Sequence, residues 1–101
     1  MPEFATPYSV KRSERKLANE ELIRAIRFSI AGEYEAIQLY EEIAETIDNE
    51  ESKRLLNEIA GDERVHAGNL LYLLNLISPE DARGHKEGVE EAEKVIKGGK
   101  E

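Results

Sequence analysis

Residues 50–77 read EESKRLLNEIAGDERVHAGNLLYLLNLI, and this stretch decides the fold. Apolar side chains recur in it at steps of three and four residues, the spacing of one face of an α-helix. Two positions of that face carry polar side chains instead, Glu63 and His66. The full row is Leu56, Ile59, Glu63, His66, Leu70, Leu73 and Ile77. A carboxylate and an imidazole on an apolar face are unfavourable unless something pairs with them, and a metal ion is the obvious partner.

A second helical pattern precedes the first and contains the same irregularity. We expect Asn19 to be its N-cap, followed by Glu20 and Glu21, because carboxylates suit the first turn of a helix. One carboxylate, Glu33, interrupts its apolar face. The row consists of Leu22, Ile26, Ile30, Glu33, Ile37, Tyr40, Ala44 and Ile47. No β pattern competes, so the sequence predicts an all-α fold.

The turn between the two helices predicts where the three polar residues lie. Residues 48–49 read as a short turn or a new helix cap, so residues 19–77 should form an antiparallel two-helix hairpin. Glu33 precedes the turn by nearly as many residues as Glu63 and His66 follow it. At roughly 1.5 Å per residue, all three fall within about one helical turn of the same height.

The remaining segments complete the predicted organisation. Residues 1–18 are expected to form a flexible N-terminal arm with a basic cluster at its end. Residues 78–97 are expected to form short C-terminal helices, interrupted at Gly84 and Gly88. Residues 98–101 are expected to be a tail or linker.

Composition excludes several kinds of site and partner. The chain has no Cys, which rules out disulfides, thiolate metal sites and Cys nucleophiles. Its net charge of −8 argues against nucleic acid as a partner. The charge suits the attraction of cations, but an acidic surface is also an ordinary means of keeping a protein soluble. The sequence has no apolar run long enough for a membrane helix and no apolar signal core, so we expect a cytoplasmic protein without a membrane partner.

The three polar residues have the chemistry of metal ligands. Carboxylates with an imidazole suit iron, manganese or zinc rather than copper(I), and the spacing of Glu63 and His66 lets both reach one ion. Ferritin-like bundles build a two-metal site from two helices that each supply a Glu and two that each supply Glu-x-x-His. This chain supplies one helix of each kind, which is half a site. Two copies related by a two-fold axis would complete it, so we predict a dimer at least, with the site on its axis.

Other interpretations stay open from the residues alone. A single Glu-x-x-His on an acidic helix is commonly a solvated face. A polar layer can also fix the register of a bundle, which would make the chain a non-enzymatic helical oligomerisation module or a structural metal-binding module. Two acids and a His per chain carry too much charge for such a layer without a cation. Tyr40 lies two turns from Glu33 and should pack in the core, with its hydroxyl near the metal ligands.

At these residues the sequence resembles the encapsulated ferritins, short ferritin-like proteins that act inside encapsulin nanocompartments. The resemblance covers about residues 20–97 and is carried by GEYEAIQLY at 32–40 and DERVHA at 62–67. The length and the missing second hairpin fit this family better than full-length ferritins or rubrerythrins, which carry both halves in one chain.

The resemblance implies a function and an assembly. The family forms a ring-shaped decamer of five dimers, with a ferroxidase centre at a dimer interface that oxidises Fe(II) to Fe(III) with oxygen. Glu33, Glu63 and His66 match the iron ligands, and Tyr40 matches an aromatic residue beside the centre. A di-iron centre is therefore expected, in which zinc, manganese or calcium could substitute. The implied role is iron storage or detoxification within an encapsulin shell.

Several positions depart from the family's pattern. Glu35 matches an acidic residue that binds cations on their way to the centre, but its usual acidic neighbour is replaced by Gly32. A Trp common beside the family's Tyr appears here as Leu39. Residues 97–101 lack an evident shell-targeting peptide, which suits a domain fused to its shell protein or a shortened chain. A rubrerythrin-like peroxidase is a further alternative, although such enzymes usually add a Cys site.

Overall fold

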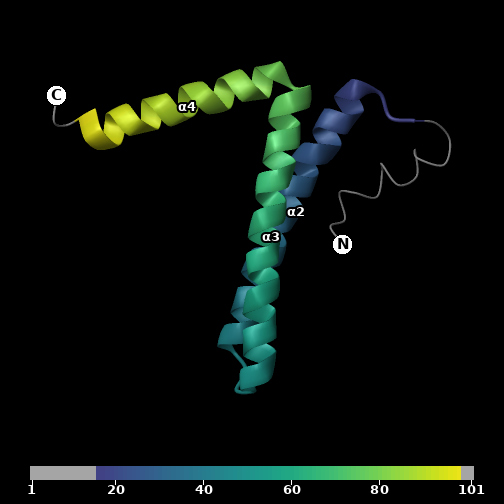
Figure 1. Cartoon of the computed structure of the whole chain (residues 1–101), viewed down its shortest axis with the longest axis vertical. Helices are drawn as coiled ribbons and strands as arrows, with labels where there is room; N and C mark the ends of the chain where they lie inside the picture. The colour runs from purple at the N-terminus through teal and green to yellow at the C-terminus, as the bar shows by residue number, and fades with distance from the viewer. Residues whose placement is uncertain (1–15, 99–101) are drawn as a thin grey trace.

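The structure, a computed structural model, describes residues 16–98. Most of the predicted N-terminal arm and of the predicted tail lies outside these residues. The described chain consists of α2 (Asn19–Glu45), α3 (Glu50–Ile77) and α4 (Pro79–Gly98) and contains no strand, so the predicted all-α class is confirmed. Figure 1 shows α2 and α3 side by side as an antiparallel hairpin, with α4 leaving the far end of α3 at a steep angle.

The start of α3 follows the predicted turn chemistry, whereas the start of α2 does not. Asn49 is the N-cap of α3, and its side-chain oxygen accepts a hydrogen bond of 2.8 Å from the backbone N–H of Ser52. Asn19 is the first residue of α2 and not its cap. The cap is Ala18, whose backbone N–H donates to the Glu21 carboxylate at 3.0 Å. The cap prediction for Asn19 was therefore wrong by one residue, because Glu21 compensates for a residue with no side-chain acceptor.

Small side chains let the two long helices approach closely. The buried residues of α3 are Ala60, Ala67 and Leu74, and Ala60 is fully buried. On α2 the buried residues are Ile26, Ile37 and Ala44. The apolar row of α3 that the sequence singles out lies at the edge of this contact, where its Leu and Ile side chains are only half-buried. The hairpin therefore leaves much of its own apolar row uncovered.

Helix α4 is continuous over its whole length, so the interruption predicted at Gly84 and Gly88 is wrong. Neither glycine has a positive φ. An ion pair of 2.8 Å from Arg27 on α2 to Asp81 ties the start of α4 to the hairpin. The buried Ser78 hydroxyl donates to the same carboxylate at 2.6 Å. The first bond links α4 to α2, and the second is local to the start of α4.

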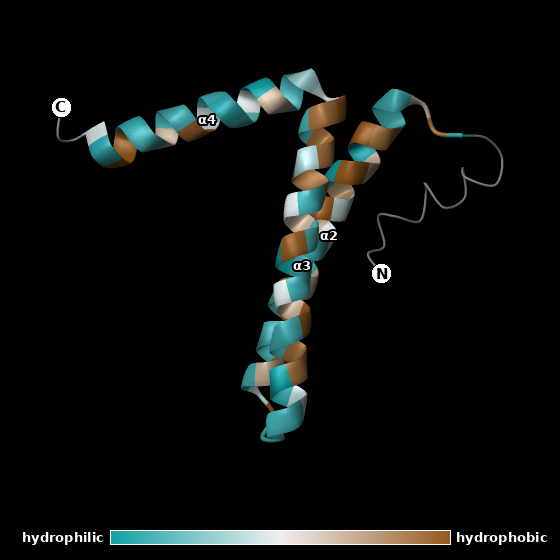
Figure 2. Cartoon of the chain, viewed as in Figure 1, coloured by the Kyte–Doolittle hydropathy of each residue, from teal (hydrophilic) through white to brown (hydrophobic). Residues whose placement is uncertain are grey.

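Hydrophobic residues occur on all three helices, including the projecting α4 (Figure 2). Within residues 16–98, no helix combines the length and the apolar character needed to cross a membrane.

The close approach at Ala60 gives a stability prediction. The substitution Ala60→Leu should lower the free energy of unfolding by about 1–3 kcal/mol, because the extra side chain must push the helices apart. The matched control is Ala31→Leu on the exposed side of α2, which should change it by less than about 0.5 kcal/mol. Urea unfolding followed by circular dichroism measures both. Equal stability of the two variants would contradict the packing described.

Candidate metal centre

Glu33 on α2 and Glu63 and His66 on α3 come together at one height of the hairpin. Each offers one ligand atom within 4.8 Å of the other two. The Nδ1 atom of His66 lies 3.1 Å from a Glu63 oxygen and 3.6 Å from a Glu33 oxygen. The proximity predicted from periodicity and the turn is therefore confirmed, while the role of the three residues as ligands stays a prediction.

The group is covered on one side and open on the other. The side chains of Glu33 and Glu63 are about one-fifth exposed, at 21% and 20%. The imidazole of His66 is 53% exposed. The two carboxylates thus sit against the helix contact, and the imidazole lies towards solvent. A ligand or a second protein chain can reach the group from the open side.

The two carboxylates are close enough to shift each other's pKa in opposite directions. Burial raises the pKa of Glu33, and the neighbouring Glu63 raises it further. A hydrogen bond from Glu33 lowers the pKa of Glu63, and His66 lowers it as well. Of the two groups, Glu33 is therefore the one that more readily holds a proton.

The Glu33 carboxylate offers an unpaired oxygen to a cation. Its buried Oε1 atom has no hydrogen-bond partner. A buried oxygen without a partner is costly, and a metal ion would satisfy it. Two carboxylates and an imidazole fit iron, manganese or zinc, and three ligands leave part of the usual coordination shell to other donors.

The structure leaves the other two predicted site residues outside this group. Tyr40 is half-buried on α2, seven residues beyond Glu33, or roughly 10 Å along the helix axis. Glu35 is exposed on the same helix. A role for Tyr40 beside the metal, and for Glu35 in attracting cations, stays a prediction.

Sequence reasoning missed one contact next to the group. Arg64, adjacent to Glu63, donates to the Glu41 carboxylate at 2.6 Å and ties α3 to α2. Glu41 lies about eight residues nearer the turn than Arg64, which is roughly 12 Å along the hairpin. A rule that pairs residues at equal distances from the turn therefore does not predict this contact. Both side chains are partly exposed, and such pairs contribute at most about 1 kcal/mol.

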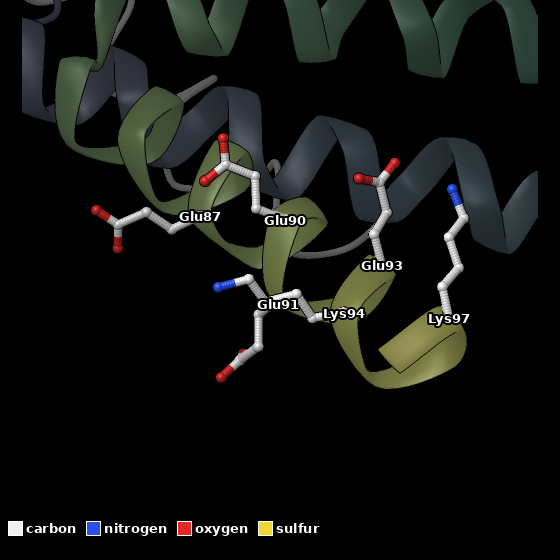
Figure 3. Close-up of a pocket in the computed structure, with 6 residues that line it drawn as sticks. All are labelled: Glu87, Glu90, Glu91, Glu93, Lys94 and Lys97. Atoms are coloured by element: carbon white, nitrogen blue, oxygen red, sulfur yellow. The ribbon is translucent and has the colours of Figure 1, made fainter. Parts of the chain in front are cut away.

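A hollow on α4 lies apart from the candidate metal centre. Figure 3 shows charged side chains around it, and none of them belongs to the three-residue group. Its lining consists of Glu87, Glu90, Glu91, Glu93, Lys94 and Lys97. We interpret it as the charged face of an amphipathic helix.

The helical hairpin and its carboxylate–histidine group define a ferritin-like domain. The chain belongs to the rubrerythrin family, which it matches over residues 24–100. The encapsulated ferritin domain of Pyrococcus furiosus has a similar structure, with a TM-score of 0.76 and 33% sequence identity. This similarity covers 83% of the present chain and 85% of the Pyrococcus domain, and it confirms the resemblance inferred from the two motifs.

Two relatives carry names that refer to encapsulins. The encapsulin nanocompartment cargo protein EncC of Myxococcus xanthus is 37% identical over 84 residues, and the ferritin-like–encapsulin shell fusion protein of P. furiosus is 32% identical over 82 residues. The matches cover 83% and 81% of the present chain. They span 65% of the Myxococcus protein and 24% of the Pyrococcus fusion protein.

The raised pKa of Glu33 predicts how the metal-free protein responds to pH. The pKa of Glu33 lies above its ordinary value of 4.5. Below pH 4.5 Glu33 is protonated in both the folded and the unfolded protein, and the stability that this neutral form gives is lost as the pH rises through the raised pKa. Without metal at neutral pH, Glu33→Gln should therefore melt at a higher temperature than the wild type. The difference should disappear in acid, where Glu33 is neutral in both the folded and unfolded wild type.

Thermal unfolding in a chelating buffer between about pH 4 and 8 checks this expectation. Glu35→Gln, on an exposed part of the same helix, is the matched control and should follow the wild type. A Glu33→Gln protein that melts with the same pH dependence as the wild type would contradict the raised pKa of Glu33.

Proposed function

We propose that two copies of this chain form a ferroxidase centre that oxidises Fe(II) to Fe(III) with oxygen. The observation that carries the proposal is the group of Glu33, Glu63 and His66, whose ligand atoms lie together and open to one side. One chain offers two carboxylates and one imidazole. Two chains offer the four carboxylates and two imidazoles of a di-iron carboxylate site.

The packing of the hairpin supports the dimer. The row that contains Glu63 and His66 also contains Ile59, Leu70 and Ile77, and these three apolar side chains are only half-buried within one chain. A second hairpin laid against this row would bury them and bring its own ligands to the open side of the group. The same contact would thus serve the core and the site.

Each residue has a definite role in this mechanism. Glu33 and Glu63 bind the substrate Fe(II), and a proton held on this pair leaves as the cation arrives. His66 binds through a ring nitrogen from the open side. Each of the two Fe(II) ions gives up one electron, and one oxygen molecule takes both electrons with two protons and leaves as hydrogen peroxide. The carboxylates favour the product because their negative charge stabilises Fe(III) more than Fe(II).

The names of the relatives support a role with an encapsulin shell. One is called a cargo protein of an encapsulin nanocompartment and the other a fusion to an encapsulin shell. We propose that this chain likewise delivers Fe(III) for storage inside such a shell, in the cytoplasm. Glu35, exposed two residues from Glu33, is proposed to attract cations on their way in.

An aerobic Fe(II) oxidation assay tests the ferroxidase activity. Glu33→Ala, Glu63→Ala and His66→Ala should each lower the rate by at least about tenfold, because each removes a ligand from both halves of the site. The matched control is Glu45→Ala, which removes an exposed carboxylate of α2 and should keep the wild-type rate.

The same assay separates the alternatives. Iron or zinc bound without oxygen-dependent turnover would favour a structural metal-binding module. Turnover that requires hydrogen peroxide in place of oxygen would favour a peroxidase. Equal oxidation rates in the wild type and all three ligand variants would reject the proposed function.

The dimer has its own test. Sedimentation velocity of metal-free and Fe(II)-loaded protein, the latter kept anaerobic, should show that loading raises the share of dimer or of larger assemblies built from it, because ions shared between chains bind only the associated form. His66→Ala should abolish this response to metal. A monomer that binds two ions by itself would contradict a site shared between chains.

A further inference from the structure

We propose that the ion pair between Arg64 and Glu41 is a positioning contact of the metal centre, which holds the ligands of the two helices at matching heights. The pair joins α3 to α2, with the Nη2 atom of Arg64 2.6 Å from a Glu41 carboxylate oxygen. Neither side chain needs to touch the ion for this role. The inference rests on the proposed metal centre and concerns how the chain keeps its ligands at binding distance.

On α3, the metal ligand Glu63 and the ion-pair residue Arg64 lie on opposite sides of the contact with α2. They follow the fully buried Ala60 by three and four residues. Steps of three and four residues turn a helix by about −60° and +40°, so the two side chains flank Ala60. Because Arg64 is next to Glu63 in the chain, a bond that fixes Arg64 also limits how far Glu63 can move.

On α2, the metal ligand Glu33 and the ion-pair residue Glu41 are arranged in the same way. Glu33 precedes the buried Ile37 by four residues and Glu41 follows it by four, so they too lie on opposite sides of the contact. The hairpin therefore has a polar contact between its helices on each side of the buried residues. The metal ligands occupy one side, and we call the side that carries Arg64 and Glu41 the back of the hairpin.

The two ligand carboxylates do not attract the helices to each other when no ion is bound. Glu33 and Glu63 repel each other when both are ionised, and this repulsion favours any movement that separates them. The buried residues on either side of Glu63 in α3 are Ala60 and Ala67, whose short side chains interlock little with α2. The attraction between Arg64 and Glu41 opposes such a movement.

The diagonal course of the ion pair suits it to this task. Arg64 lies about eight residues farther from the turn than Glu41, roughly 12 Å along the hairpin. Sliding of α3 along α2 therefore changes the length of the pair at once, whereas a contact between residues at one height responds much less. Metal ligands act only over a narrow range of distances, so a slide of about 1 Å would weaken the site.

Apolar packing contributes little at the back of the hairpin near Glu41. A hollow between the two helices lies there, and four of its five lining residues are polar or charged. The lining consists of Glu41, Ala44, Glu45, Lys53 and Asn57. The ion pair lies at the edge of this hollow, because Glu41 belongs to both. It is thus an attractive contact at a place where the helices pack poorly.

Titration calorimetry of the full chain with Zn(II) tests the positioning role. Zn(II) suits the two carboxylates and the imidazole and is not oxidised by oxygen. The site is defined as the binding that His66→Ala removes, and all titrations use one protein concentration. Arg64→Met and Glu41→Gln should each raise the Kd of this site by roughly three- to fivefold, the scale on which a partly exposed ion pair acts.

The direction of the change separates positioning from a simple effect of charge. Arg64→Met removes a positive charge near a cation site, so charge alone would make Zn(II) bind more tightly. The positioning role predicts weaker binding instead. The double variant should bind like either single variant, because each substitution removes the same contact. Charge alone predicts a double variant that binds like the wild type.

Two matched controls are available. Arg27→Met breaks the other ion pair that joins two helices, Arg27 to Asp81, and should leave the Zn(II) Kd unchanged even where it lowers the melting temperature. Arg54→Met removes an exposed positive charge from α3 and should not weaken binding. Circular dichroism at the titration temperature establishes that each variant is folded.

The outcomes distinguish the positioning role from the metal centre itself. An Arg64→Met protein that binds Zn(II) at least as tightly as the wild type would overturn the positioning role alone. Equal weakening by Arg27→Met would overturn it as well, because the effect would then follow general stability. A wild type without the site that His66→Ala removes would reject the metal centre together with the positioning role.

Discussion

Two helices can bury only the narrow strip of side chains along which they touch, and this constraint governs the whole molecule. Here the buried residues of the described hairpin are three alanines, two isoleucines and one leucine, so little apolar surface is enclosed. The leucines and isoleucines that would form the core of a larger bundle stay half-covered at the edge of the strip. The exposed side of the metal group and the exposed apolar side chains of α4 have the same cause, because the other helices of one chain do not cover them.

The polar group at the edge of the strip lowers the free energy of unfolding. Glu33 and Glu63 hold two carboxylates together where water is partly excluded, and their repulsion contributes to the raised pKa of Glu33. A cation would relieve this repulsion and would also satisfy the buried Glu33 oxygen. The three side chains lie within ligand distance of one another, so an ion bound there would need little rearrangement of them.

Sequence reasoning predicted the features that depend on local rules. The hairpin and the meeting of Glu33, Glu63 and His66 follow from helical periodicity and from a turn at Asn49, and both are observed. The prediction failed at Gly84 and Gly88, which do not interrupt α4. The low helix propensity of two glycines is outweighed there by the good helix formers around them. Sequence reasoning could not find the Arg64–Glu41 pair or the buried alanines, because both depend on how the two helices tilt and approach.

The junction between α3 and α4 is a single residue, Ser78, which is buried and bonded to Asp81. Ser78 has an extended backbone, with φ −130° and ψ 90°, so this one residue sets how α4 starts relative to α3, and an inserted residue would change that geometry. It would also draw Asp81 away from Arg27. The length of this junction is therefore constrained. Related chains that hold α4 in the same direction should differ in the sequence of α4 more readily than in the number of residues between α3 and α4.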